Sequence, residues 1–478
     1  MAIVGAEHVQ SVGRIQDLSD WWPLALKNAP DFLLNSAPAV IVSPASASEV
    51  ADVLRVCTAL EMAVTQRGRG SGVVGAAIPS NGGVLLDLQR LNRIGPVDTE
   101  NLLVTAEAGV VGGHLEQELQ AQGLTCGVYP QSLDVSTIGG WIATRATGTY
   151  SGCYGGIEDR LAGIEVALAD GRCVRTPEMP RWAIGPNLSQ LFLGTEGTLG
   201  VVTSVTLRLD RWPDRRLLRA CMFPNLHAGL AAVRAFTQDG LQPAVVRLYD
   251  EEETRHHRAL LSSDAAGCLL ILAFDGPARL TAIVEELTLE TCVSRGAIDL
   301  GREPAERWDA KRLNVPPGFA AVRQPGIMAD FIDLQAPWDH LEETYRTVRD
   351  ALLMHCTTAM AHFSHVYNQG SSIYFVISIE ASDDEEAVRR YLAAWDAAMT
   401  AVFASGATIA HHHGIGMARA PWVMQALGDA WPLWGMLKRA FDPLGILNPG
   451  KLGHTGPVNG VPVPDAPLVT DQTDGTDA

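Results

Sequence analysis

The hydrophobic pattern of the first half of the chain alternates between short apolar runs and segments with helical spacing. Residues 39–44 (AVIVSP) are typical of a buried strand, and the apolar residues of 46–60 recur on one face of a helix. A strand at 62–66 then leads into a glycine-rich loop, 67-RGRGSGVVG-75. Further strands are predicted at 84–88, 102–109, 163–168 and 200–209, together with a helix at 110–123 that Gly123 closes.

After Trp212 the pattern changes to strands separated by helical stretches. Strands are predicted at 217–223, 244–249, 268–274, 327–333 and 372–380, with helices among them at 226–236 and 340–355. This alternation indicates an α+β unit with an antiparallel sheet. Helices at 384–404 and 431–441 follow, separated by a His/Gly loop at 411–416, and the Pro-, Asp- and Thr-rich tail from Val458 predicts disorder.

Between Pro130 and Gly156 the chain is dense in Gly, Ser and Thr and has few long side chains. This composition predicts a poor core, but it suits close approach of the backbone to a ligand. Four clusters of this kind occur in the chain, at 67–75, 131–140, 144–148 and 194–200. Together they indicate a long ligand that lies against several loops.

The glycine-rich loop permits two interpretations. Gly70, Gly72 and Gly75 spell GxGxxG, which with Asp87 can be read as a dinucleotide-binding fingerprint. That fingerprint requires a crossover helix whose amino end receives the pyrophosphate. Residues 76–83 (AIPSNGGV) contain a proline and two glycines and are too short for such a helix. The pattern therefore favours the alternative, a nest of backbone N–H groups that binds phosphate without a helix.

Composition and charge narrow the range of partners. With 47% apolar and 19% charged residues the chain is an ordinary globular protein. Its formal charge of −18 opposes nucleic acid and leaves at most peripheral contact with an anionic membrane, although a few arginines can still bind a small anionic substrate. The eight cysteines form no CxxC pair and the N-terminus shows no signal-peptide pattern, so we expect a cytoplasmic protein.

In their order, these motifs resemble the FAD-binding domain of the vanillyl-alcohol oxidase / p-cresol methylhydroxylase superfamily. The matching segments are AVIVSPASASEVADVLRVC, RGRGSG, PQSLDVSTIGGWIAT, YGGIEDRLAGIEVALADG, GTEGTLGVVTSVTLRL and FDPLGILNPGK. The resemblance implies an α+β fold: a two-subdomain FAD-binding domain of the p-cresol methylhydroxylase type and an α+β cap (substrate) domain with an antiparallel sheet. We expect an N-terminal segment at 1–37, the FAD-binding domain at 38–212, the cap domain at 213–417, a C-terminal helical segment at 418–457 that returns to the FAD-binding domain, and a disordered tail at 458–478.

The resemblance also implies FAD as the cofactor and a set of residues that bind it. Carried over onto this sequence, that set is Arg67, Gly68, Arg69, Gly70, Ser71, Gly72, Pro130, Ser132, Ser136, Thr137, Gly139, Gly140, Thr144, Gly148, Glu196, Thr198, Gly200, Val202 and Lys451. Some relatives attach the flavin covalently through a histidine in the glycine loop. The loop at 67–75 contains no histidine, so we expect non-covalent FAD.

Within the superfamily, the second half of the chain is most similar to the alkyldihydroxyacetonephosphate synthases. The likeness rests on GGWIATRATGTYSGCYGGIED, on AVVRLYD, on APWDHLEETYRTV followed by SSIYFV, and on ATIAHHHGIGMAR. It implies a reaction that exchanges the acyl chain of acyl-dihydroxyacetone phosphate for a fatty alcohol through an adduct at flavin N5, without net redox change. It also implies the homodimer that is typical of those enzymes.

The proton-transferring candidates are three histidines and a tyrosine. By pattern alone, the run His411, His412 and His413 can be an exposed loop or a metal site, although three neighbouring imidazoles point in divergent directions. Imidazole titrates near neutrality and suits proton transfer beside a flavin. Tyr374 lies in an apolar strand and by pattern is a core aromatic. The resemblance places the histidine run at the active site and gives Tyr374 a part in acid/base chemistry.

Two arginines are candidates for binding a substrate anion. Arg247 and Arg323 both interrupt apolar runs. Most arginines lie at the surface, whereas one that breaks a strand pattern more often has an anion to bind, because burying it unpaired is costly. The resemblance places matching arginines at the substrate phosphate and the active site.

The stretch 361-AHFSHVYNQGSSIY-374 supports a rival hypothesis. Related D-2-hydroxyacid dehydrogenases bind a metal here through two histidines and a carboxylate. His365 matches the first ligand, but Tyr374 and His412 stand at the other ligand positions and Asn368 replaces an aspartate. We therefore predict no metal, with His365 the open question. The alternative function is an FAD-linked oxidase or dehydrogenase of a D-2-hydroxy acid or another hydroxylated small molecule, with hydride transfer to flavin N5.

Overall fold

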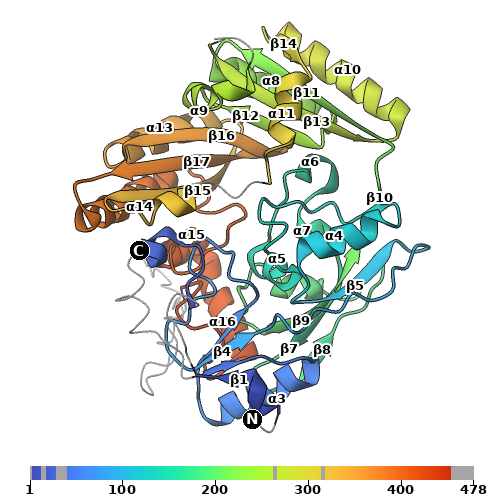
Figure 1. The fold of residues 1–478 in the computed structure, drawn as a ribbon, viewed down its shortest axis with the longest axis vertical. Coiled ribbons are helices and arrows are strands. Elements are labelled where there is room, and N and C mark those ends of the chain that lie inside the picture. The colour runs from blue at the N-terminus through green and yellow to red at the C-terminus, as the bar shows by residue number, and fades with distance from the viewer. Residues whose placement is uncertain (1–2, 12–17, 28–39, 262–265, 314–317, 454–478) are drawn as a thin grey trace, which may run out of the picture.

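The computed structural model describes residues 3–11, 18–27, 40–261, 266–313 and 318–453, and the predicted disordered tail lies outside them. Two domains are stacked along the long axis (Figure 1): the domain with the glycine-rich loop lies below and the predicted cap lies above. Antiparallel sheets combined with helices confirm the predicted α+β class. The exact domain boundaries stay a prediction.

The base of the lower domain is a four-stranded sheet of order β1-β2-β4-β3, in which β2, β4 and β3 are parallel. Its strands are β1 (Val9–Gln10), β2 (Val40–Val42), β3 (Val64–Arg67) and β4 (Val84–Asp87). Helix α3 (Ala47–Ala59) begins where predicted, because the Ser46 hydroxyl accepts the Glu49 N–H and the Glu49 carboxylate accepts the Ala45 N–H. Residues 68–83, all described, contain no helix, which excludes the dinucleotide fingerprint.

The second sheet of the lower domain is antiparallel, with order β5-β9-β7-β8. Its strands are β5 (Leu103–Glu107), β7 (Leu161–Ala167), β8 (Cys173–Arg175) and β9 (Val201–Arg208), and a two-stranded ribbon pairs β6 (Leu124–Thr125) with β10 (Asp210–Arg211). The helices around it are α4 (Gly112–Gln120), α5 (Ile138–Thr144), α6 (Ser151–Tyr154), α7 (Ile157–Arg160) and η3 (Leu188–Phe192).

The segment between Pro130 and Gly156 departs from the expected poor core. It contains α5 and α6, and its aromatic residues Trp141 and Tyr154 are buried in the main core of the domain. A side chain on Gly112 would strike the Trp141 ring, and one on Gly127 would strike the Tyr154 ring. Composition alone missed this, because a few large rings packed against glycines fill the space that many small residues leave.

The cap domain contains a seven-stranded antiparallel sheet of order β14-β11-β13-β12-β16-β17-β15. Its strands are β11 (Arg215–Phe223), β12 (Val245–Tyr249), β13 (Cys268–Gly276), β14 (Ile298–Gly301), β15 (Ile327–Pro337), β16 (Thr358–Tyr367) and β17 (Gly370–Glu380). Strand β16 was not predicted, although the apolar residues Ala359, Ala361 and Phe363 form one of its faces. It pairs with both β12 and β17 and is therefore central to the sheet.

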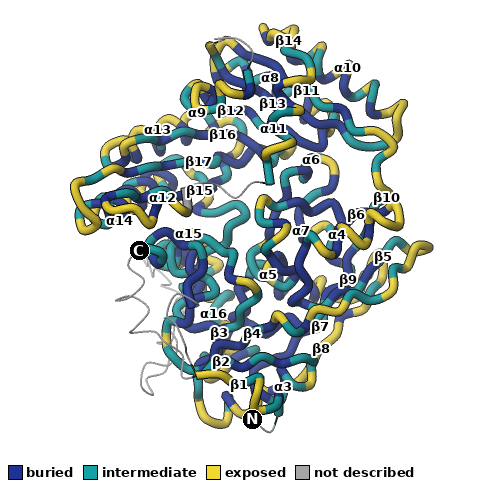
Figure 2. Tube along the Cα trace, in the orientation of Figure 1, coloured by how far each residue is buried: buried dark blue, intermediate teal, exposed yellow. Residues whose placement is uncertain are grey.

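Helices cover one face of the cap sheet, and the other face meets the lower domain (Figure 1). The cap helices are α8 (Leu226–Gln238), α9 (Glu251–His256), η4 (Arg258–Leu260), α10 (Ala278–Ser294), α11 (Glu303–Asp309), α12 (Gly318–Ala321), α13 (Leu341–Leu353) and α14 (Asp384–Ala404). Of these, η4 and α11 pack on the side of the lower domain, because Leu260, Ala305 and Trp308 belong to its core. Figure 2 shows the sheets as mostly buried, whereas the outer side of α10 is exposed. The uncovered face of the sheet is thus available to form a site.

The C-terminal segment returns to the lower domain beside β3. It consists of η5 (Ala420–Trp422), α15 (Val423–Leu427), η6 (Gly428–Ala430) and α16 (Trp431–Phe441). The Val64 N–H donates to the Ile446 carbonyl at 2.8 Å, and the Asn448 N–H donates to the Val64 carbonyl at 2.8 Å. Residues far apart in sequence thereby complete the edge of the first sheet.

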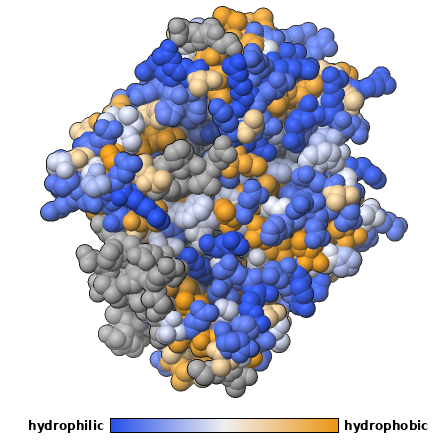
Figure 3. Space-filling view, viewed as in Figure 1, coloured by the Kyte–Doolittle hydropathy of each residue, from blue (hydrophilic) through white to orange (hydrophobic). Residues whose placement is uncertain are grey.

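The face shown in Figure 3 is largely hydrophilic over the cap domain, with hydrophobic side chains in separate areas. Exposed apolar residues on α10 include Leu280, Ile283 and Leu287. None of the helices described has the length and apolar character needed to cross a bilayer.

Candidate active site between the two domains

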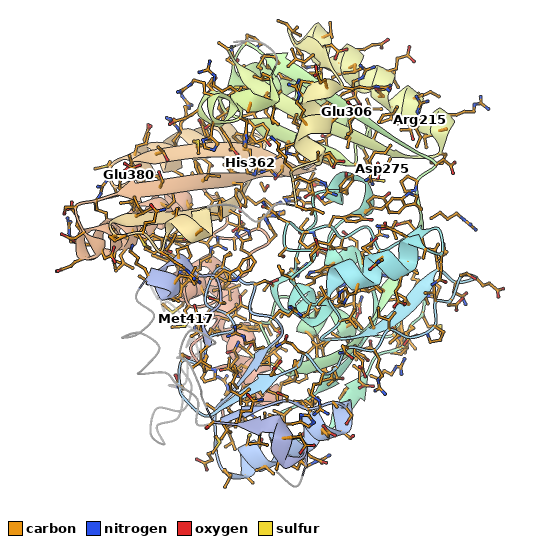
Figure 4. All side chains as sticks on the ribbon, viewed as in Figure 1. Arg215, Asp275, Glu306, His362, Glu380 and Met417 are labelled. Atoms are coloured by element: carbon orange, nitrogen blue, oxygen red, sulfur yellow. The ribbon has the colours of Figure 1, made fainter. Side chains whose placement is uncertain are left out.

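A cavity of about 490 Å³ lies where the cap sheet faces the lower domain. Its lower wall comes from the loop after β3, the start of α5 and the turn at 195–202. Its upper wall comes from β12, β16, β17 and the loop that contains His412 and His413. Figure 4 shows the labelled His362 on the side of the cap that faces the lower domain. A ligand in this cavity contacts both domains.

Glycines let the lower wall approach a ligand closely. Gly70 has a φ of +65°, a left-handed conformation that favours glycine, and a Cβ there would strike the Arg67 guanidinium. A Cβ on Gly68 would strike the Thr137 side chain, and one on Gly139 would strike Ala108. Thr137 also caps α5 by accepting the Gly140 N–H at 3.3 Å. A larger residue at any of these positions would therefore collide with the protein, so the wall is built from closely packed backbone.

Two polar groups of the lower wall are aimed at a ligand or at the cap. The Gln66 side-chain amide is buried against the cavity, and no described residue forms a hydrogen bond with it. The Glu196 carboxylate accepts the N–H groups of Ile415 at 2.6 Å and Gly416 at 2.9 Å, which ties the turn at 195–202 to the histidine loop. Burial raises the pKa of Glu196 to about 6, and those N–H groups act against this shift.

The upper wall is a row of side chains across four adjacent strands. In the sheet register, Tyr249 lies opposite His362, His362 opposite Tyr374, and Tyr374 opposite Asp333. Residues directly opposite each other on antiparallel strands share a face. Arg247 stands two residues before Tyr249 and therefore extends the row on the same face. Strand pairing thus brings together the members of this row, which lie far apart in the sequence.

A β-bulge adds His365 to this wall. The pairing of β16 with β17 shifts register between Ser364 and Val366, and His365 there has a φ of +51°. In a regular strand His365 would face away from His362, because successive side chains alternate. The bulge lets both residues line the cavity, and His365 Nδ1 lies 2.7 Å from the Ser151 hydroxyl of the lower domain.

Asp333 organises the histidine loop. Its Oδ2 accepts the backbone N–H groups of His411 and His412 at 2.7 Å each and that of His413 at 3.3 Å. Its Oδ1 lies 2.9 Å from His413 Nδ1 and accepts a hydrogen bond from Arg419, which is fully buried. Burial by itself would raise the pKa of Asp333, but the charge of Arg419 and the contact with His413 hold it well below its ordinary value.

Tyr374 lies among imidazoles. Its ring centroid is 4.6 Å from that of His362, 5.4 Å from His413 and 5.9 Å from His412. Burial, reinforced by the negative charge of Asp333, holds the pKa of Tyr374 well above its usual value. Burial likewise lowers the pKa of His412 well below its usual range. At neutral pH the cavity therefore presents a protonated phenol beside a neutral imidazole, a proton donor next to an acceptor.

A buried carboxylate supports His362 from behind. Both Glu253 oxygens lie 3.0 Å from His362 Nδ1, and Arg247 Nη2 lies 3.4 Å from the same nitrogen. Burial and the charge of Arg247 lower the pKa of His362 to about 4, against the opposing effect of Glu253. Arg247 Nε is buried and has no hydrogen-bond partner in the described part of the chain. Arg247 is thus a cation held at the cavity with an unsatisfied donor.

The histidine run does not diverge as expected. His411 Nδ1 lies 2.9 Å from His412 Nδ1, and the nearest ligand atoms of His365, His411 and His412 all lie within 4.8 Å of one another. Those of Asp333, His412 and His413 form a second such group. Because both sets combine nitrogen or oxygen donors at close range, the geometry is compatible with a metal ion. The absence of a metal remains a prediction.

Comparison with known proteins now decides the family. Residues 38–177 match the FAD binding domain family, and residues 213–452, half of the chain, match the C-terminal domain of FAD linked oxidases. The chain belongs to the FAD-linked oxidases.

Several relatives of this FAD-linked oxidase are known by name. The uncharacterized FAD-linked oxidoreductase YgcU of Escherichia coli strain K12 is 30% identical over 439 residues, which cover 87% of this chain and 89% of that protein. Alkyldihydroxyacetonephosphate synthase of Dictyostelium discoideum is 26% identical over 460 residues, covering 89% of this chain and 74% of that protein. A D-lactate dehydrogenase of Anaerostipes hadrus is 28% identical over 437 residues, which cover 87% of this chain and 89% of that protein.

Solved structures confirm the fold. An alkyldihydroxyacetonephosphate synthase in a P212121 crystal is 23% identical with a TM-score of 0.78, covering 94% of this chain and 83% of that one. p-Cresol methylhydroxylase with substrate bound is 17% identical with a TM-score of 0.79, covering 95% of each chain. The predicted p-cresol methylhydroxylase-type fold is therefore correct, and FAD is the cofactor of this FAD-linked oxidase. The glycine wall and the unpaired Gln66 amide fit such a group.

Most of the predicted site residues of the FAD-linked oxidase line the cavity. Their particular roles stay predictions. The predicted cofactor residues that line it are Arg67, Gly68, Arg69, Gly70, Ser71, Gly72, Pro130, Ser132, Ser136, Thr137, Gly139, Gly140, Thr144, Glu196, Gly200 and Val202, and the predicted catalytic residues are Arg247, Tyr374, His412 and His413.

Three predicted cofactor residues do not line the cavity, because each has a packing role. Gly148 packs so closely on the Tyr129 backbone that a Cβ would overlap it. The buried Thr198 hydroxyl donates to the Thr195 carbonyl at 2.8 Å. Lys451 Nζ donates to the Ile78 carbonyl at 2.8 Å, which anchors the C-terminal segment, and burial lowers its pKa to about 8.

Two predicted catalytic residues also lie outside the cavity wall. His411 turns to the Tyr367 hydroxyl, which lies 2.8 Å from its Nε2. Arg323 is exposed on the turn before β15 and does not line the cavity. Its apolar neighbours suggested burial, but that turn leaves its side chain in solvent. Arg323 and Arg247 were both expected to bind a substrate anion, but only Arg247 lines the cavity.

Sequence reasoning missed the charged supports of the site. Asp333, Arg419 and Glu253 are all buried, and none was proposed. A signal was available for Asp333, since it is an acidic residue inside the apolar run IMADFIDLQ and the same reasoning had singled out Arg247. Glu253 lies in an acidic stretch that is indistinguishable from a solvated helix end.

We expect FAD to be released when the FAD-linked oxidase is denatured. The loop at 67–75 has no histidine to form a covalent link. After acid precipitation, the flavin absorbance should be found in the supernatant and the pellet should be colourless. Because His257, His362, His365, His412 and His413 also line the cavity, a yellow pellet would show that another side chain forms the link.

Proposed function

We propose that this FAD-linked oxidase exchanges the acyl chain of acyl-dihydroxyacetone phosphate for a fatty alcohol. The observation that carries the proposal is the placement of Tyr374 against His362, His412 and His413 in a cavity that also contains Arg247. The similarity to the Dictyostelium synthase over most of both chains supports it. In the net reaction a C–O bond to the fatty carboxylate breaks and a C–O bond to the alcohol forms, so no electrons are gained or lost.

The chain's residues provide proton transfer and positioning. Bound FAD supplies an electrophilic ring that can also accept two electrons. The phenol of Tyr374 stays protonated, because its pKa is held well above its usual value, and it therefore presents an O–H donor to the substrate. His413 presents Nδ1 to Asp333, which leaves Nε2 to take a proton from the substrate. Arg247 offers its unpaired N–H to the substrate anion.

The second candidate is oxidation of a D-2-hydroxy acid. It is favoured by the close grouping of His365, His411 and His412 and by the similarity to the D-lactate dehydrogenase. In this reaction His413 takes the hydroxyl proton, and Arg247 binds the carboxylate. The two reactions share the same residues and differ in whether the substrate is oxidised.

An anaerobic titration of the FAD-loaded protein, followed by the visible flavin spectrum, separates the two candidates. Under the proposal, acyl-dihydroxyacetone phosphate bleaches the flavin band, and a fatty alcohol restores it without any oxidant. A panel of D-2-hydroxy acids should leave the band unchanged. Bleaching by a hydroxy acid that only air or a dye reverses would instead establish the oxidoreductase.

A further inference from the structure

A second cation at the cavity, Arg312, has an unsatisfied hydrogen-bond donor. Arg312, just after helix α11, lines the cavity with Trp308 and Lys311, and its side chain is only 12% exposed. Its Nε donates to Asp309 at 2.7 Å, whereas its Nη1 is buried and finds no hydrogen-bond acceptor among the described residues. A buried guanidinium N–H without an acceptor is costly, so this donor is set for a ligand atom.

The surroundings of Arg312 hold it in place and leave its Nη1 donor available. Its guanidinium carbon lies 4.9 Å from the Tyr150 ring centroid and 5.9 Å from that of Tyr129. The neighbouring Arg216 is different, because Asp275 binds it through two hydrogen bonds of 2.8 and 2.6 Å. Asp275 thus occupies two donors of Arg216, whereas Asp309 occupies only the Nε of Arg312 and leaves its Nη1 free among the described residues.

Arg312 and Arg247 belong to different parts of the same wall. Arg247 contacts His362, beside the proton-transferring residues, whereas Arg312 stands on tyrosines of the lower domain. Between them the wall continues through Tyr249 and Trp308, whose side chains interact. A ligand that satisfies both arginines must extend along this wall.

We propose that Arg312, with Lys311 beside it, binds an oxyanion at the end of the substrate remote from the reacting carbon. This rests on the proposed function, in which that oxyanion is the phosphate. Under oxidation of a hydroxy acid it is a second carboxylate. The guanidinium fork matches either group, because it presents parallel N–H donors to paired oxygens. Arg312 thus takes the role that the sequence suggested for the exposed Arg323.

The test measures equilibrium binding to the FAD-loaded full chain by calorimetry, so it does not depend on turnover. Two pairs of ligands are compared. In the first pair, dihydroxyacetone phosphate is compared with dihydroxyacetone, and in the second, D-malate is compared with D-lactate. The variants are Arg312→Gln, the charge-preserving Arg312→Lys, and Arg302→Gln as a matched control, since Arg302 is exposed at the start of α11 and outside the cavity wall. Arg323→Gln tests the competing assignment.

We expect wild type and Arg302→Gln to bind dihydroxyacetone phosphate more tightly than dihydroxyacetone, or D-malate more tightly than D-lactate. Loss of a charge-assisted hydrogen bond should reduce this preference roughly tenfold to a hundredfold in Arg312→Gln, with an intermediate effect in Arg312→Lys. The pair of ligands that shows the preference identifies phosphate or carboxylate as the group bound. If this preference appears while the anaerobic titration fails, the subsite stands and the proposed reaction falls.

Three results would overturn the inference. One is a wild-type protein that does not distinguish the ligands within either pair. The second is a larger loss of preference in Arg323→Gln than in Arg312→Gln. The third is an Arg312→Gln protein that keeps the preference but loses affinity for FAD, which would place Arg312 at the cofactor.

Discussion

Asp333→Asn is expected to lower the free energy of unfolding by about 3–5 kcal/mol, the usual cost of breaking a buried ion pair by removing one partner. Arg419 is fully buried and donates to this carboxylate, so the variant leaves a buried cation without its counter-charge. An asparagine keeps the shape but has only one oxygen. Its NH2 group would face either Arg419 or the N–H groups of the histidine loop, which are all donors.

Asp330→Asn is the matched control for this experiment, because it makes the same change at a buried position of the same strand. Asp330 accepts hydrogen bonds from the neutral Tyr391 and Trp395 side chains, and burial raises its pKa to about 6. Its replacement should cost about 1 kcal/mol or less. Denaturant unfolding of the FAD-loaded proteins measures both values. Equal losses in the two variants would contradict an ion pair at Asp333.

The effect of Asp333→Asn should persist down to about pH 4. The pKa of Asp333 is lower in the folded protein than the value of about 3.9 in an unfolded chain. Its charge therefore contributes stability that is fully present above the unfolded pKa and is lost only as the pH falls through the folded pKa. Groups that do not interact with Asp333 titrate in both proteins and cancel from the difference.

The largest expected effect on turnover comes from His413→Ala and Tyr374→Phe. Each variant removes a proton-transferring group that lines the cavity, and such groups typically contribute about 10²–10⁴-fold to the rate. We therefore expect kcat to fall by about that factor in both variants, with FAD still bound. Turnover of whichever substrate bleaches the flavin measures the effect.

His411→Ala separates proton transfer from mere disturbance of the loop. His411 belongs to the same histidine run, but its Nε2 meets the Tyr367 hydroxyl outside the cavity wall. Its removal should cost less than about tenfold in kcat, because its side chain does not line the cavity. A loss as large as that of His413→Ala would mean that the run acts as a unit, as in the metal-binding alternative.

Regular elements of the fold were predictable because their signals are local. The capped helix α3 and the helices α14 and α16 begin and end close to their predicted limits, since periodic apolar residues and caps lie within one segment. Strand β16 was missed although Ala359, Ala361 and Phe363 alternate with mostly polar residues, and the bulge at His365 interrupts that alternation. Its polar face is a ligand wall, and sequence patterns fail where function replaces an apolar core.

By itself, the sequence determined the superfamily through the resemblance of its ordered motifs, and with it the cofactor and the type of fold, because each motif lies within one segment of the chain. It also supplied Tyr374, His412, His413 and Arg247. Only the tertiary structure decided which side chains meet. Strand register aligns Asp333, Tyr374 and His362, a bulge turns His365 toward them, and packing of α11 on the lower domain brings Arg312 rather than Arg323 to the cavity. These contacts join distant segments, so no local pattern can specify them.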